Sequence, residues 1–496
     1  MCTSPLHIKP KNVYESHYNY VRANVPCCKC ASCREQYRIE WLNRLCFEYD
    51  ANKGGCAVFL TFTYNNEHLP SYTDGNFHVK CFNHQHVLKF LKTLRRYYIK
   101  RVGFVPFKYF FASEYGKTTQ RPHYHALFFL DAIISQDWQT FCEVCREIWS
   151  TSIFHNFFGS SVTDIQSNNY GFMFPNLVGA RLVNGKVIGG QYLDEKGQDR
   201  CPKINDGYGG MSYCSKYVCK DLSYYTPEIN HYIENCSSDV LEKFKKYLPK
   251  HWPKHWQSNK LGYSAVDVAR ANIHSALDSG IVNPLSLKKI PLPSYVINKL
   301  MYINVYRDRL NIDGKRLYDK EISEFGKLYF EKLFRTRVHK TAEKMFIRFQ
   351  MLPSCFPLLS SVGANFKNVE SFYGLALYHL YLKNISNVLL EDMLYFVGGS
   401  PADLFNVDNV APYYYRSKSQ AYKRTHPDFD TEKRAFGEFW RNNYAFIFSD
   451  YENLDNSYSD LCIEIECDTM AKRLEKFNQI IDTKEKLTHG FPKNLC

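Results

Sequence analysis

The chain has 496 residues, so two or three domains are expected rather than a single core. Hydrophobic residues make up 45% and charged residues 23%, which is typical of a globular protein. The net charge of +13 favours a polyanionic partner, either nucleic acid or a membrane surface.

The first 20 residues contain no apolar core of a secretory signal, and no run approaches the roughly 18 apolar residues of a membrane span. We therefore expect a cytoplasmic protein with reduced thiols and no membrane partner. Residues 251–350 hold 18 Lys/Arg and 9 Asp/Glu, whereas residues 351–496 hold 15 and 19. A nucleic-acid surface is therefore expected within the first 350 residues.

Hydrophobic spacing predicts most elements of the first 300 residues. The first 25 residues are polar and aperiodic, which is typical of a tail. In order, the predictions are a helix from Arg34 to about Asp50, a buried strand over 57–64, a helix from His86 to Arg101 with Leu88, Leu91, Leu94 and Tyr98 inward, strands over 107–114 and 123–130, a helix from Asp137 to Trp149 with Ser135 as cap, a hairpin turn at Asn184-Gly185, and a helix from near Ser212.

This order predicts an α+β domain with a central antiparallel sheet and flanking helices. After about residue 300 the pattern is mostly α-helical, notably over Glu321–Met351 and Ser371–Val397. The predicted organisation is a tail over 1–25, a first domain over 26–300 and a helical C-terminal domain over 301–496.

His123 and His125 lie two residues apart in a predicted strand, so their imidazoles point to the same face. Tyr124 points to the packed side. Glu114, near the end of the preceding strand, would come close to both histidines if the connection is tight. Two histidines and one carboxylate suit a divalent ion that also holds a substrate oxygen. An isolated H-x-H pair would otherwise be structural.

A second motif is Tyr213-Cys-Ser-Lys216-Tyr217-Val-Cys-Lys220. Tyrosines four apart on a helix lie on one face, and each is followed three residues later by a lysine. Positive charge helps a phenol to act as a nucleophile, and lysine also binds phosphate. An amphipathic helix with half-buried tyrosines is the structural alternative. Together with H-x-H, the doubled motif indicates phosphodiester transesterification with two nucleophiles.

At these motifs the chain resembles the replication initiators of microviruses, in particular the gokushovirus-like branch. The resemblance rests on the Cys27/Cys30/Cys33 run with Arg34, on FLTFTYNNEHLP (59–70), on SEYGKTTQRPHYHALFF (113–129) and on YCSKYVCK (213–220), with a weaker match over 262–300. Cys28 stands where that family has glycine, and the segment 165–208 between the motifs is long.

The resemblance implies an HUH-endonuclease-like fold and rolling-circle replication in the bacterial host. It implies Mn²⁺ or Mg²⁺ bound by Glu114, His123 and His125, and Tyr213 and Tyr217 as nucleophiles that form a 5′-phosphotyrosine. The implied partner is supercoiled phage origin DNA exposed as single strand. Recruitment of a host helicase or DNA polymerase by residues 301–496 is suggested by fold analogy.

Other residues have weaker assignments. Cys27, Cys30 and Cys33 could supply three ligands of a structural Zn²⁺, and a buried thiol cluster is the alternative. Lys92, Arg95, Arg96 and Arg121 are candidates for contacts with DNA phosphates, and the first three could equally form a solvated face. Thr61 and Thr63 share a strand face and are expected to be structural.

Three other functions stay open. A metallohydrolase that activates water with His123 and His125 would not need paired tyrosines. A non-catalytic single-strand-binding protein would need no divalent ion. Relaxases and transposases use the same tyrosine chemistry.

Overall fold

The computed structural model divides the chain into two compact units, residues 34–296 and residues 1–33 with 297–496. The residues that the structure describes are 6–8, 23–25, 27, 30–74, 77–116, 121–150, 168–218, 231–232, 234–235, 237–251, 253–310, 316–351, 366–382 and short stretches between 403 and 475. Each unit is described by itself.

The unit of residues 34–296 alternates strands and helices. Its elements are α1 (Ala31–Ala51), β3 (Cys56–Tyr64), β4 (Ser71–Asp74), β5 (Phe77–Lys80), α2 (His84–Val102), β6 (Phe107–Tyr115), β7 (Pro122–Leu130), α3 (Ala132–Ser135), α4 (Trp138–Trp149), β8 (Gly171–Phe174), β9 (Asn176–Val178), β10 (Arg181–Val183), β11 (Lys186–Ile188), β12 (Gln191–Leu193), α5 (Gly207–Ser215), the 3-10 helix η2 (Lys216–Val218), α7 (Ser238–His251), β13 (His255–Gln257), α8 (Ser264–Ala271), α9 (Ile273–Ser279), β14 (Ile281–Val282), β15 (Lys289–Ile290) and α10 (Ser294–Leu300).

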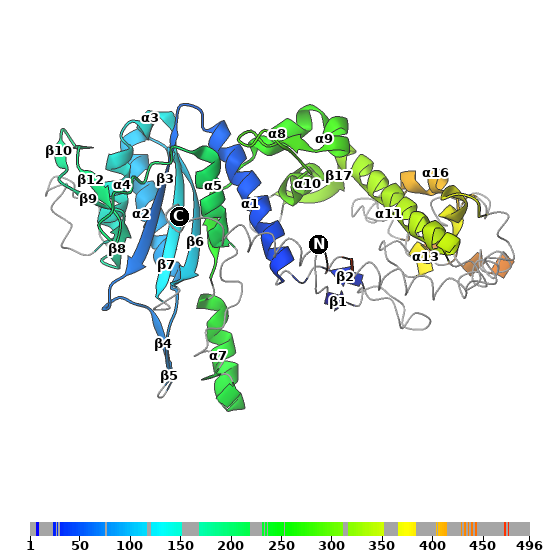
Figure 1. The fold of residues 1–496 in the computed structure, drawn as a ribbon, viewed down its shortest axis with the longest axis horizontal. Helices are drawn as coiled ribbons and strands as arrows, with labels where there is room; N and C mark the ends of the chain where they lie inside the picture. The colour runs from blue at the N-terminus through cyan, green and yellow to red at the C-terminus, as the bar shows by residue number, and fades with distance from the viewer. Residues whose placement is uncertain are drawn as a thin grey trace. The chain divides into compact units, whose positions relative to one another are not determined.

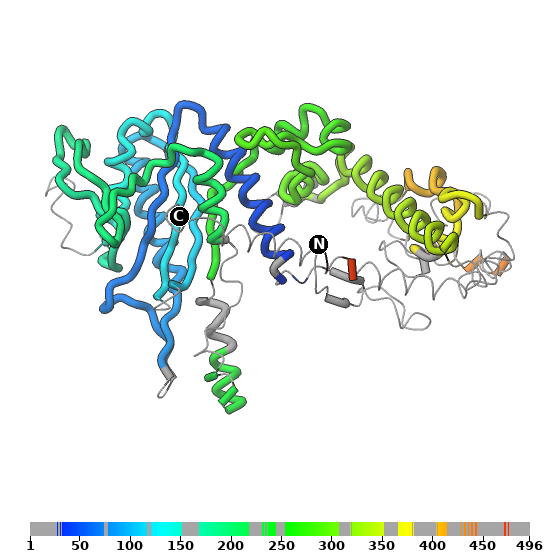
Figure 2. Tube along the Cα trace, viewed as in Figure 1, coloured from blue at the N-terminus to red at the C-terminus, as the bar shows by residue number. Residues whose placement is uncertain are grey.

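A five-stranded sheet is the centre of this unit (Figure 1). The strand order is β13-β6-β7-β3-β8, and every neighbouring pair is antiparallel. Figure 2 traces the three central strands in blue and cyan, with the segment of α5 in green beside them. The predicted α+β class with a central antiparallel sheet and flanking helices is confirmed.

The two faces of the sheet are covered by different helices. Residues with even numbers on β3, such as Leu60 and Phe62, pack in one core with residues of α2 and α4. Ala57 of β3 and Leu127 of β7 pack in a second core with α1 and α5. Tyr124 belongs to the first core, where its hydroxyl lies 3.0 Å from that of Tyr64, so its predicted direction is confirmed.

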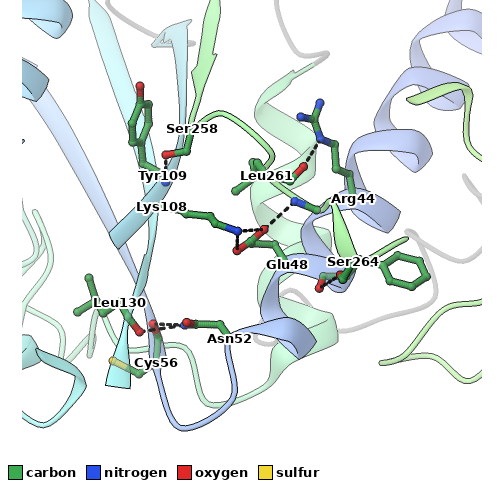
Figure 3. A network of polar contacts seen from close by, with 12 residues as sticks. Arg44, Glu48, Asn52, Cys56, Lys108, Tyr109, Leu130, Ser258, Leu261 and Ser264 are labelled. Atoms are coloured by element: carbon green, nitrogen blue, oxygen red, sulfur yellow. Dashed lines mark hydrogen bonds and ion pairs between the residues drawn. The ribbon is translucent and has the colours of Figure 1, made fainter. Parts of the chain in front are cut away.

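Polar contacts hold α1 against the edge of the sheet and the segment around residue 261 (Figure 3). The Glu48 carboxylate is 4% exposed, lies 2.7 Å from Lys108 Nζ and accepts a 2.7 Å hydrogen bond from the backbone N–H of Gly262. Arg44 Nε donates to the carbonyl of Leu261 at 2.7 Å. Because a buried carboxylate is costly without such donors, these contacts fix α1 in one position.

Two local predictions are wrong. Ser135 ends α3 instead of capping the next helix, and α4 begins after Asp137, whose side chain makes no capping bond. Leu88 is 46% exposed, because the buried stripe of α2 follows Val87 and Leu91 around the helix instead. The predicted hairpin turn is confirmed: Asn184 and Gly185 join β10 to β11 with φ of 50° and 73°.

The other unit contains two strand pairs and several helices. Its elements are β1 (Leu6–Ile8), β2 (Ala23–Val25), β16 (Tyr302–Leu310), β17 (Arg316–Ile322), α11 (Glu324–Met351), the 3-10 helix η5 (Glu370–Phe372), α13 (Tyr373–Leu382), α16 (Val407–Val410) and the 3-10 helix η6 (Ala411–Tyr413). The mostly helical character after residue 300 is confirmed.

The strand pair β16–β17 was not predicted, and the helix expected from Glu321 starts at Glu324 because Glu321 pairs with Ile303 in the hairpin. Strands β1 and β2 pair within the segment expected to be a tail. Residues 383–397 of the second predicted helix lie outside the described residues. Among the described helices, none is long and apolar enough to cross a membrane.

Candidate active site

The register of the central strands brings the predicted metal ligands to one face. Glu114 of β6 lies directly opposite His123 of β7, and Thr61 of β3 lies opposite His125. Since side chains alternate along a strand, these four share the face that α1 and α5 cover.

His125 and Glu114 are in direct contact. His125 Nε2 lies 3.0 Å from Glu114 Oε1, and the two side chains are largely buried. Thr61 Oγ1 lies 3.1 Å from the other ring nitrogen, which fixes the orientation of the imidazole. Two ligands that hold one ion at about 2.1 Å and at a right angle lie about 3 Å apart. The Glu114 and His125 donor atoms therefore suit neighbouring ligand positions on one ion.

His123 is not brought into this contact. Its ring lies against Gly116, where an added Cβ would stand 2.8 Å from His123 Nε2. Within the described part of the chain, Cys27, Cys30 and Cys33 are the only three His, Cys, Asp or Glu residues with donor atoms all within 4.8 Å of one another. The predicted three-ligand set is thus assembled only in part, and His123 would have to turn toward Glu114 to complete it.

The two tyrosines lie over these residues. The Tyr217 hydroxyl donates to the Tyr213 hydroxyl at 2.5 Å. The Tyr217 ring centroid lies 3.8 Å from that of His125, and Phe59 of β3 packs against both phenols with centroids at 5.5 and 5.9 Å. The sheet face and the tyrosine helix therefore form one cluster of chemically useful groups.

The helix that carries the tyrosines starts earlier than predicted. The Asp206 carboxylate accepts a hydrogen bond from the backbone N–H of Gly209, so α5 begins at Gly207 and not near Ser212. Cys214, buried in the core beneath α5, anchors the turn that presents Tyr213. Tyr217 follows in η2.

Arg200 is a residue of this cluster that the sequence motifs did not indicate. Its Nη2 donates to the Tyr213 hydroxyl at 3.3 Å, and its guanidinium lies 5.8 Å from the centroid of that ring. It comes from the long segment between the metal and tyrosine motifs. No spacing rule could connect it to Tyr213, because the contact depends on how that segment folds back.

The two phenols have different environments. Burial raises the pKa of Tyr217 well above its ordinary value near 10, and the hydrogen bond to Tyr213 and the charge of Glu114 act in the same direction. Tyr213 is 37% exposed and accepts hydrogen bonds from Tyr217 and Arg200. Negative charge is therefore better accommodated on the oxygen of Tyr213 than on that of Tyr217.

The other predicted catalytic groups lie beside or beyond this cluster. Lys216 is exposed, with Nζ 5.9 Å from the centroid of the Tyr213 ring. Lys220 lies outside the described residues. Arg121 precedes β7 and its Nη2 donates to the Tyr64 carbonyl at 2.8 Å, so it ties β7 to the end of β3.

Three of the four predicted DNA contacts are not brought to the tyrosines. Lys92, Arg95 and Arg96 belong to α2, which packs on the opposite face of the sheet. Arg95 donates to the Tyr109 hydroxyl at 2.7 Å, and Lys92 and Arg96 are exposed. Their DNA-binding role stays a prediction.

Comparison with known proteins relates the first unit to replication proteins. Residues 57–222 match the family model of replication-associated protein ORF2. The replication-associated protein ORF2 of Spiroplasma virus 4 is 39% identical over 117 residues, which cover 23% of this chain and 35% of that protein. The replication-associated protein VP4 of Bdellovibrio phage phiMH2K is 34% identical over 111 residues, which cover 21% of this chain and 31% of that protein.

The match thus spans about a third of the length of these relatives. No solved structure matches the chain. The matched region contains the sheet, Glu114, both histidines and both tyrosines. The predicted resemblance to microvirus replication initiators is confirmed over this region, and residues 57–222 form a domain of the replication-associated protein ORF2 family.

Proposed function

We propose that this domain nicks one strand of phage origin DNA by tyrosine transesterification and later rejoins the ends to close unit-length circles. The observation that carries the proposal is the packing of the Tyr217 ring on His125, with its hydroxyl 2.5 Å from that of Tyr213. This arrangement puts two phenols beside a carboxylate–histidine pair that suits a divalent ion.

In the proposed reaction a tyrosine oxygen attacks the scissile phosphorus and the bond from phosphorus to the 3′ oxygen breaks. The phenol loses its proton and the departing 3′ oxygen gains one, so the products are a free 3′-hydroxyl and a 5′-phosphotyrosine. Because the ester energy is kept, a 3′-hydroxyl can later attack the phosphotyrosine and rejoin the strand.

Glu114 and His125, with His123 turned toward them, would hold Mn²⁺ or Mg²⁺. Such an ion, when bound, stabilises the negative charge that develops on the attacked phosphate. Thr61 would keep the His125 ring in the orientation that directs Nε2 toward the ion, since it lies 3.1 Å from Nδ1.

Tyr213 is the better placed first nucleophile. Its oxygen accepts hydrogen bonds from Tyr217 and Arg200, which favour the phenolate. Tyr217 would act in a second cleavage, after the first phosphotyrosine has removed negative charge from its neighbour. The exposed Lys216 and Arg200 would contact the flanking phosphates.

The test uses the full chain, Mn²⁺ and labelled single strands tiled across the genome that encodes the protein. A strand labelled at its 3′ end should yield label that migrates with protein in denaturing electrophoresis. A strand labelled at its 5′ end should release a free shorter fragment. Absence of any covalent adduct with every strand would reject the nickase.

Variants separate the alternatives. The double variant Tyr213→Phe/Tyr217→Phe should form no adduct, whereas Tyr208→Phe, which alters an exposed tyrosine of the same helix, should behave as wild type. Free cleavage products from the double variant would indicate a metallohydrolase. Binding without cleavage, with or without Mn²⁺, would indicate a single-strand-binding protein.

A further inference from the structure

Three cysteines form a second cluster, at the start of α1. The sulfur atoms of Cys27, Cys30 and Cys33 all lie within 4.8 Å of one another. All three are thiols. We propose that they bind a single zinc ion as thiolates, and that this ion ties the segment before α1 to the first turn of the helix.

The separation of the sulfur atoms fits one ion. Thiolates that share a tetrahedral zinc ion at about 2.3 Å lie about 3.8 Å apart. The observed limit of 4.8 Å leaves only small side-chain adjustments. In an iron–sulfur cluster each cysteine binds a different iron atom, so the cysteine sulfurs lie farther apart than ligands of one ion. The geometry therefore favours a mononuclear site.

The local backbone favours negative charge on these sulfurs. The backbone N–H of Cys30 donates to Cys27 Sγ at 3.2 Å, a contact that stabilises a thiolate. Cys33 lies in the first turn of α1, which contains no acidic side chain. The positive end of the helix dipole is thus available to the thiolates. These features are independent of the residues around Tyr213.

The proposed site has three protein ligands from a seven-residue segment. A fourth tetrahedral position is left for water or for a side chain outside the described residues. Since zinc would bind the folded segment and compete with protons for the thiols, it would stabilise the start of α1 and be lost at low pH.

The first test measures metal in the full-length protein. Elemental analysis should find one zinc ion per chain, and X-ray absorption should find at least three sulfur neighbours at about 2.3 Å. Zinc far below one equivalent, iron with inorganic sulfide, or a disulfide between two of the cysteines in the intact mass would each overturn the proposal. These measurements need no variant to fold.

Variants assign the metal to this cluster. After dialysis against a chelator, Cys30→Ser and Cys33→Ser should fall to background zinc, whereas Cys201→Ser, which replaces an exposed cysteine, should keep the wild-type content. Glu114→Gln should also keep it, which distinguishes this ion from the one proposed for DNA cleavage. Retention of zinc by both cluster variants would refute the assignment.

Discussion

Replacement of Tyr217 by phenylalanine removes one hydroxyl and leaves the ring that packs on His125 and Phe59. The lost group donates a 2.5 Å hydrogen bond to Tyr213. If Tyr213 attacks first, Tyr217→Phe takes one donor from the developing phenolate. Tyr213→Phe instead removes the nucleophile and leaves Tyr217, whose pKa is raised by burial.

The size of the effect follows from this hydrogen bond. A hydrogen bond to a charged group contributes about 1.5–3 kcal/mol, and each 1.4 kcal/mol changes a rate about tenfold. Tyr217→Phe should therefore slow the first cleavage about 10- to 150-fold and still form the adduct. Tyr213→Phe should slow it more.

Single-turnover formation of the adduct on a 3′-labelled strand measures both rates, and peptide mass spectrometry identifies the modified tyrosine. The wild-type rate should rise with pH, because the phenolate fraction increases. The first adduct should map to Tyr213, and Tyr208→Phe serves as the matched control. A first adduct on Tyr217, or a larger loss in Tyr217→Phe than in Tyr213→Phe, would refute the assignment.

Further predictions concern three other residues. Arg200→Ala should slow adduct formation a few-fold, since its bond to Tyr213 is long and exposed and is worth about 0.5–1.5 kcal/mol, and Arg200→Lys should recover part of the rate; equal rates in all three proteins would contradict this role. Gly116→Ala should displace the His123 ring and raise the Mn²⁺ concentration needed for half-maximal nicking, without a comparable loss in melting temperature; unchanged Mn²⁺ dependence would indicate that His123 is no ligand. Burial lowers the pKa of His255 to about 4, so unfolding free energy should fall as pH drops from 6.5 toward 4. Between pH 7 and 5 this residue should account for about 2 kcal/mol, and in urea titrations His255→Gln should show a correspondingly smaller loss; an identical loss would refute the contribution of His255.

The sign of the last prediction follows from the direction of the shift. The folded protein holds His255 neutral at a pH where the unfolded chain binds a proton, because burial is the largest cause and Arg44 acts in the same direction. Protonation therefore stabilises the unfolded state first, and the loss is complete once the pH passes below the folded pKa.

Several features could be predicted from local periodicity. The alternation of side chains in a strand put His123 and His125 on one face and Tyr124 on the other. The four-residue spacing of Tyr213 and Tyr217 brought their hydroxyls together. These relations depend on backbone geometry within a few residues, which the residue order alone determines.

Other features could not be predicted, since they depend on contacts between distant segments. The packing of α2 and α5 on opposite faces separates Lys92, Arg95 and Arg96 from the tyrosines. Local hydrophobic spacing shows which side of a helix is buried but not which face of the sheet it covers.

The sequence by itself thus determined the chemical groups of the site and the strand face that carries them. Only the tertiary structure decided that Arg200 reaches Tyr213, that Thr61 orients His125, and that His123 lies against Gly116. The reason is physical: strand register and helix placement are set by long-range packing of apolar faces, and the polar contacts of the site follow from that packing.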